Sequence, residues 1–133
     1  HIKMKLIKEI KSKSGEVHFR RWEILKTRWG SIWLHAIYKA DQDKHLHNHP
    51  WDFKSLILKG SYKELTESGV YLQTPGKFNN RNGEAYHKIL ELLSPVVYTL
   101  FFVSPTKREW GYNVDGKFID HITYRELKNT NNL

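Results

Sequence analysis

Short runs rich in apolar, β-branched and aromatic residues follow one another along most of the chain, and turn-forming residues separate them. The runs typical of strands cover residues 17–27, 31–40, 53–58, 61–65, 70–73, 85–93, 96–104, 109–114 and 117–124. Turn signals such as Gly60 and Thr74-Pro75-Gly76 stand between them. Only residues 123–129 favour a helix. Short strands at this spacing predict an all-β sandwich or barrel, with a jelly roll among the candidates.

The chain has no internal repeat, low-complexity tract or linker, and its 133 residues suit one domain. Residues 1–16 are rich in lysine and predict a basic N-terminal arm or edge strand. Residues 17–127 contain the predicted barrel, and residues 128–133 are expected to form a frayed C-terminal tail. We therefore expect a single β domain with a basic extension.

The chain is basic, with 22 lysine and arginine residues against 14 acidic ones and a formal charge of +8. Such a charge favours anionic partners such as nucleic acid, nucleotides or phosphorylated metabolites, and it also serves to keep a surface soluble. Basic and aromatic side chains alternate in Arg20-Arg21-Trp22 and again in residues 26–29. This pattern keeps nucleic-acid binding open as the third-ranked function.

Several classes of protein are excluded or disfavoured by what the sequence lacks. Without cysteine there is no thiol catalysis, disulfide or cysteine-based zinc site. No apolar run approaches the roughly 20 residues of a membrane span. Lysines interrupt the N-terminal segment, so we expect no signal peptide and a cytoplasmic location. The sequence also lacks a phosphate-binding P-loop, a G-x-G-x-x-G motif and a G-x-S-x-G motif.

Three histidines, His45, His47 and His49, alternate with other residues in the middle of the chain. Residues two apart in a strand point to the same face, so these imidazoles are able to converge. Two neutral imidazoles at this spacing suit one divalent metal ion such as iron, manganese, nickel or zinc. The alternative is the solvated polar face of an edge strand. We favour a metal site, with His87 as the best remote ligand, and interpret the remaining histidines as structural: His18, His35 and His121.

Two blocks, HNHPWDFKSLILKGSYKE (residues 47–64) and YTLFFVSPTKREWGY (residues 98–112), together with His87, resemble the cupin superfamily. The resemblance is strongest to small bacterial and phage cupins that carry an H-[DN]-H-P-W-[DN]-F segment and a later R-x-W-G-[FY] segment. It implies a jelly-roll β-barrel that binds one metal ion through three histidines and a glutamate. By this resemblance, His47 and His49 match the paired histidines, Gly60 the closing glycine, and His87 the histidine of the second block.

The sequence departs from the general cupin pattern at the acidic ligand. Phe53 occupies the glutamate position counted back from Gly60, and Asp52 stands just before it. If His45 and His47 formed the pair instead, Asp52 would match the acidic position. We therefore predict His47, His49 and His87 as metal ligands, Asp52 as a fourth, and His45 as an alternative. Three histidines completed by water also satisfy a divalent metal.

Aromatic and charged residues beside these motifs are candidates for contact with a substrate. Trp51 and Trp110 suit stacking against a planar ligand, and Arg81 and Arg108 suit a clamp on phosphate or carboxylate. Each of the four also fits an ordinary structural role. Further acid–base candidates, whose geometry the sequence leaves open, are Glu84, Glu109 and Tyr86.

These observations favour a metal-binding cupin protein, and among such proteins a metal-dependent enzyme of the dioxygenase, isomerase or hydrolase type. Its substrate is expected to be an anionic small molecule, nucleotide- or sugar-like. The alternative from another class is a non-enzymatic module that retains a ligand or contacts a host protein, as a phage-like setting suggests. Because cupins often pair through edge strands, the resemblance also implies a homodimer, with residues 1–16 as the pairing element.

Overall fold

The computed structural model describes residues 3–133, and nearly all of its regular structure is β-strand. The elements are β1 (Lys5–Lys11), β2 (Val17–Thr27), β3 (Gly30–Ile37), β4 (Phe53–Lys59), β5 (Tyr62–Thr66), β6 (Gly69–Gln73), β7 (Phe78–Arg81), β8 (His87–Leu92), β9 (Val97–Val103), β10 (Gly111–Val114), β11 (Lys117–Asp120) and the helix α1 (His121–Asn129).

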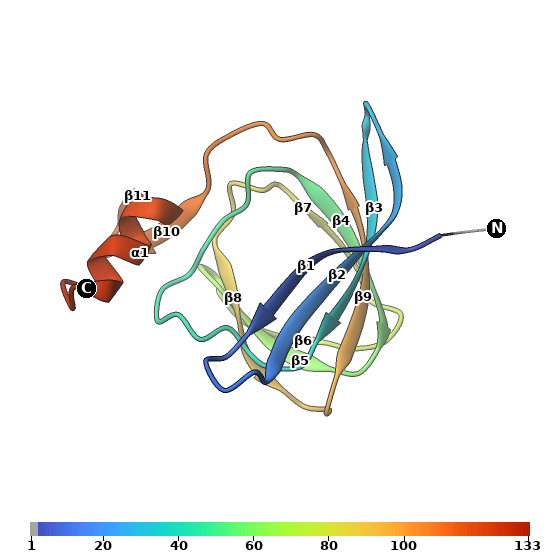
Figure 1. Ribbon diagram of the computed structural model, residues 1–133, viewed down its shortest axis with the longest axis horizontal. Coiled ribbons are helices and arrows are strands. Elements are labelled where there is room, and N and C mark those ends of the chain that lie inside the picture. Colours follow the sequence, from blue (N-terminus) through green and yellow to red (C-terminus); the bar gives the residue numbers. More distant parts are fainter. Residues whose placement is uncertain (1–2) are drawn as a thin grey trace.

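The strands form three antiparallel sheets. The largest has the order β1-β2-β3-β9-β4-β7, a second has β6-β5-β8, and β10 and β11 form a hairpin. The two larger sheets curve around a common interior, while the hairpin and α1 lie together to one side (Figure 1). Among residues 3–133 no helix is long and apolar enough to cross a lipid bilayer.

β1 lies at the edge of the large sheet, within residues 1–16, for which the sequence predicts a basic arm or edge strand; residues 1–2 fall outside the described part. Its outer edge pairs with no strand among residues 3–133. An unpaired edge is a template for another strand. The homodimer therefore stays a prediction, in which two copies of the chain pair through β1.

The structure differs from the sequence prediction at the last strand, at the helix and at one additional strand. The last strand ends at Asp120 because that side chain caps α1 and accepts hydrogen bonds from the backbone of Ile122 and Thr123. The helix begins at His121, two residues before the predicted start, and ends at Asn129 as predicted, so that Lys128 and Asn129 belong to it and not to a frayed tail. β7 was not predicted, because its sequence, FNNR, is polar and follows a turn. It pairs with β4 nonetheless.

The core inside the barrel consists of two clusters. One contains Trp33, Trp51, Phe53 and Val103, with Phe101 packed against them. The other is built from side chains of four different strands: Ile37, Ile57, Tyr62 and Val97. The first cluster borders the segment that carries the alternating histidines. The aromatic core therefore forms one wall of the candidate site.

Candidate metal centre

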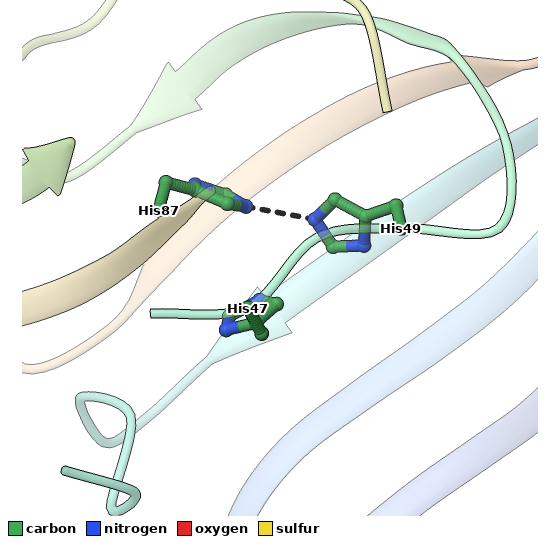
Figure 2. Close-up of side chains that lie close together, drawn as sticks. All are labelled: His47, His49 and His87. Carbon is green, nitrogen blue, oxygen red and sulfur yellow. Dashed lines mark hydrogen bonds between the residues drawn. The ribbon is translucent and has the colours of Figure 1, made fainter. Parts of the chain in front are cut away.

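His47, His49 and His87 come together inside the barrel, as the sequence predicts (Figure 2). Each histidine contributes one ring nitrogen, and these three nitrogens lie within 4.8 Å of one another. The backbone enforces this meeting, since His47 N donates to His87 O at 3.0 Å and His87 N donates to His47 O at 2.9 Å. Two distant parts of the sequence are thereby joined at the residues that carry the imidazoles.

Asn48, between the two histidines, explains why they share a face. It is buried, its backbone N–H donates to Gly111 O at 3.0 Å, and its side-chain oxygen accepts from Gly111 N at 2.8 Å. His49 N donates in turn to Gly83 O at 2.8 Å. Although His47 makes only isolated bridges and belongs to no regular strand, the side chains alternate as in one.

Glu64 is the main residue of the site that sequence reasoning missed. It lies on β5, is 3% exposed, and accepts a hydrogen bond from His87 Nδ1 at 2.6 Å through Oε2. Its other oxygen accepts from Arg81 at 2.6 Å and from Gln73 at 3.1 Å. Asn79 donates to Gln73 at 2.8 Å and completes a buried polar network. A carboxylate that holds one ring nitrogen of a histidine orients the other toward a metal.

The electrostatics of the cluster favour neutral ligands. Burial lowers the pKa of His47 to about 4, and the nearby His87 acts in the same direction. Burial, followed by the charges of His87 and His47, holds the pKa of His49 well below its usual value. Neutral imidazole is the form that binds a metal. Burial alone would raise the pKa of Glu64, but hydrogen bonds and charge from His87 and Arg81 lower it to about 2.

The donor set fits one divalent metal ion. With His87 Nδ1 bound to Glu64, its Nε2 faces His49 Nε2 at 2.7 Å. Two ring nitrogens at this distance share a hydrogen bond, and a bound metal ion would replace it. Three imidazoles suit zinc, iron, nickel or manganese with open coordination positions. The histidine cluster is therefore a candidate metal centre.

The structure places the two other predicted ligands away from the cluster. His45 lies in a bend, where its Nδ1 is 2.9 Å from the Tyr124 hydroxyl. Asp52 accepts through Oδ1 from Gly83 N at 2.8 Å and from Arg108 at 2.9 Å. Its Oδ2 accepts from Lys107 at 3.1 Å. Neither residue belongs to the group of possible metal ligands found among residues 3–133.

The Asp52 contacts predict a pH-dependent contribution to stability. The hydrogen bond from Gly83, followed by those from Lys107 and Arg108, lowers the pKa of Asp52 from 3.8 to about 2. The ionised carboxylate thus stabilises the fold above about pH 4, and this stabilisation is lost as the pH falls toward about 2. We expect Asp52→Asn to reduce the free energy of unfolding by about 1 kcal/mol near neutral pH. Thermal unfolding of both proteins between about pH 7 and 3 tests this, because the difference must narrow on acidification.

The side chains predicted to bind substrate already contact other protein groups. Trp51 is 8% exposed and stacks on His49 with ring centroids 4.6 Å apart. Trp110 stacks on His121 at 4.5 Å and lies 6.5 Å from His47. Arg81 is paired with Glu64, and Arg108, as described, with Asp52. The acid–base candidates Glu84 and Glu109 are exposed, and Tyr86 is half-buried.

Phe53, at the position where the cupin pattern has a glutamate, belongs to the aromatic wall. It is 6% exposed, and its ring centroid lies 5.2 Å from that of His49. The acidic group beside the histidines comes instead from β5, as Glu64. A sequence signal existed, because the alternation Tyr62-Lys63-Glu64 places Glu64 on the same inward face as the aromatic Tyr62.

No protein-family model matches the chain, and no curated protein matches it in sequence. Solved structures do match. A cupin-2 domain from Rhodospirillum rubrum has a TM-score of 0.64 and 14% identity, over 95% of this chain and 82% of that one. A putative mannose-6-phosphate isomerase from Ralstonia eutropha has a TM-score of 0.57 and 13% identity, over 68% and 85% of the two chains. The Fe(II) form of HppE has a TM-score of 0.61 and 8% identity, over 76% of this chain and 56% of that one.

These likenesses concern the fold, because every identity is well below the level at which activity is shared. They agree with the architecture described above and with the cupin fold that the sequence resemblance implies. The chain is a single all-β domain with the cupin-type jelly-roll fold.

Proposed function

We propose that this chain is a metal-dependent cupin enzyme that acts on an anionic small molecule. The observation that carries the proposal is the convergence of three imidazole nitrogens within 4.8 Å, one of them on a histidine held by a buried carboxylate. Structures similar to this chain include proteins named as an Fe(II) form and as a putative isomerase of a sugar phosphate. Those names describe other proteins and support the proposal only as chemistry that the fold accommodates.

Each residue of the centre has a distinct part in this proposal. His47, His49 and His87 would hold the metal ion, which when bound supplies Lewis acidity or the activation of dioxygen. Glu64 keeps the proton of His87 on Nδ1 and thereby leaves Nε2 as a lone-pair donor. Trp51 covers one face of His49 and excludes water from it. The overall charge of +8 favours a substrate of opposite sign.

Elemental analysis of chelator-washed and reconstituted protein tests the metal centre. We expect about one metal ion per wild-type chain, and near loss of the metal in His47→Ala and in His87→Ala, because two imidazoles alone hold a divalent ion weakly. Thermal unfolding of the metal-free proteins shows whether each variant keeps its fold.

His45→Ala is the matched control, because it removes a histidine of the same segment that lies outside the cluster. It must retain the metal. A wild-type chain that stays empty with each candidate ion, under anaerobic conditions where iron requires them, would refute the metal centre. Equal metal content in all four proteins would refute the ligand assignment.

A further inference from the structure

Arg21 is a cation on the inner side of the barrel that has no carboxylate partner within residues 3–133. It lies in the middle of β2, and its guanidinium carbon is 4.2 Å from the Trp33 ring centroid and 5.7 Å from that of Trp51. Its Nε donates to His35 Nε2 at 2.9 Å, the only side-chain hydrogen bond that Arg21 makes within residues 3–133. No ion pair within that range includes it. The terminal nitrogens of the guanidinium are therefore left without a protein acceptor there.

A second cation stands beside it. Lys8 on β1 lies directly opposite Arg21 in the register of the two strands and likewise belongs to no ion pair within residues 3–133. The next pair along the ladder differs, since Glu9 and Arg20 face each other on the outer side and form an ion pair at 2.7 Å. Like charges at facing positions destabilise a sheet. The Glu9–Arg20 pair thus neutralises its charges, whereas Lys8 and Arg21 have no opposite charge paired with them in the described part of the chain.

The protein groups around Arg21 do not offset its charge. Burial lowers the pKa of Arg21 to about 10, which reflects the cost of keeping the cation there. Burial also keeps the pKa of His35 well below its usual value, so this histidine is a neutral acceptor. Stacking on Trp33 contributes a cation–π attraction. Arg21 is half-buried. A charge withdrawn from water is stabilised by an opposite charge, and a bound anion would provide one.

Arg21 lies near the histidine centre. Trp51 contacts both, because its ring stacks on His49 at 4.6 Å and lies 5.7 Å from the Arg21 guanidinium carbon. The charge of Arg21 also contributes to the lowered pKa of His49. An oxyanion held by Arg21 would therefore lie on the same inner side of the barrel as the three histidines, with Trp51 between Arg21 and His49.

We propose that Arg21, with Lys8 beside it, binds a carboxylate or phosphate group of the small molecule that reaches the histidine centre. The planar guanidinium fork matches either oxyanion with two parallel hydrogen bonds. Arg81 and Arg108 already have carboxylate partners, whereas Arg21 has none among residues 3–133. The link to the histidines rests on the proposed function, but anion binding by Arg21 does not require a metal.

Quenching of tryptophan fluorescence reports this binding, because Trp33 and Trp51 flank the guanidinium. The full chain is titrated with inorganic phosphate and, separately, with acetate at low ionic strength, both as purified and after chelation. We expect saturable binding of at least one anion, and Arg21→Gln is expected to weaken it about tenfold or more. The tighter of the two anions identifies the group.

Arg20→Gln is the matched control, since it removes an equal charge from the outer face of the same strand and must leave the affinity unchanged. Arg21→Lys is the second variant, to be used if Arg21→Gln fails to fold. It keeps the charge without the planar fork, so it is expected to bind the anion more weakly than the wild type without losing it. Wild-type affinity in Arg21→Gln, equal losses in Arg20→Gln, or no binding of either anion would overturn the proposal. Metal content, measured on the same samples, tests the proposed function separately.

Discussion

Glu64→Gln is expected to weaken metal binding by about 10- to 100-fold, the usual effect of losing a carboxylate that holds a histidine ligand. The carboxylate of Glu64 accepts from His87 and Arg81 at 2.6 Å and from Gln73 at 3.1 Å. A glutamine places an NH₂ group, itself a donor, opposite one of these donors, so that one hydrogen bond is lost. His87 then loses the partner that keeps its proton on Nδ1. Competition with a metal chelator measures the change in affinity.

The same substitution is expected to lower the free energy of unfolding of the metal-free protein by about 3 kcal/mol, because it breaks a buried ion pair. The side chain of Glu64 is 4% exposed and that of Arg81 is 22% exposed, so part of the remaining charge reaches water. Denaturant unfolding measures this effect. The nitrogen chemical shifts of His87 show whether its proton has left Nδ1, a change that a loss of stability alone does not cause.

Glu84→Gln is the control for both measurements, because Glu84 is 73% exposed and lies 3.8 Å from Arg108. It removes the same charge without touching the histidines. We expect little change in metal affinity and in stability. If Glu64→Gln binds the metal as tightly as the wild type, Glu64 does not position His87.

Gly83→Ala is expected to destabilise the protein by about 3 kcal/mol or more, the upper end of the usual cost of overpacking, because this site cannot relax. A Cβ atom at Gly83 would lie 2.1 Å from the backbone oxygen of Trp51 and 2.4 Å from the Arg108 side chain. The first of these atoms is backbone and cannot turn away. Gly83 also accepts from His49 N at 2.8 Å and donates to Asp52 at 2.8 Å. A shift of this residue therefore displaces the segment that carries His49.

Denaturant unfolding and metal affinity of Gly83→Ala test this prediction together. Gly76→Ala is the comparison, because a Cβ atom there meets nothing within 4 Å and only its positive φ of 88° opposes the substitution. Its cost is expected to be about 1–2 kcal/mol, with metal affinity unchanged. A Gly83→Ala protein with wild-type stability would show that the Trp51 backbone has room to move.

Most strands were predictable from the sequence, because their burial follows a local alternation. β2 has the predicted bounds, and β4, β5, β6, β8 and β9 differ from the predicted runs by two residues or fewer at each end. β7 was missed since its polar Asn79 is satisfied by Gln73, a partner six residues away that no periodicity reveals. The last strand ends early, at Asp120, because this side chain caps the helix. Its role as an acceptor cannot be predicted until the start of the helix is known.

The sequence by itself determined the fold class and the three histidines, since alternation in an extended segment and a spaced motif are local properties. Only the tertiary structure decided between His45 and His49, because a bend turns His45 to Tyr124. It also turned Asp52 toward Gly83 and brought Glu64 to His87 across the pairing of β5 with β8. Which carboxylate meets which imidazole depends on how strands distant in sequence are aligned, and the energies that set this alignment come from packing rather than from neighbours along the chain.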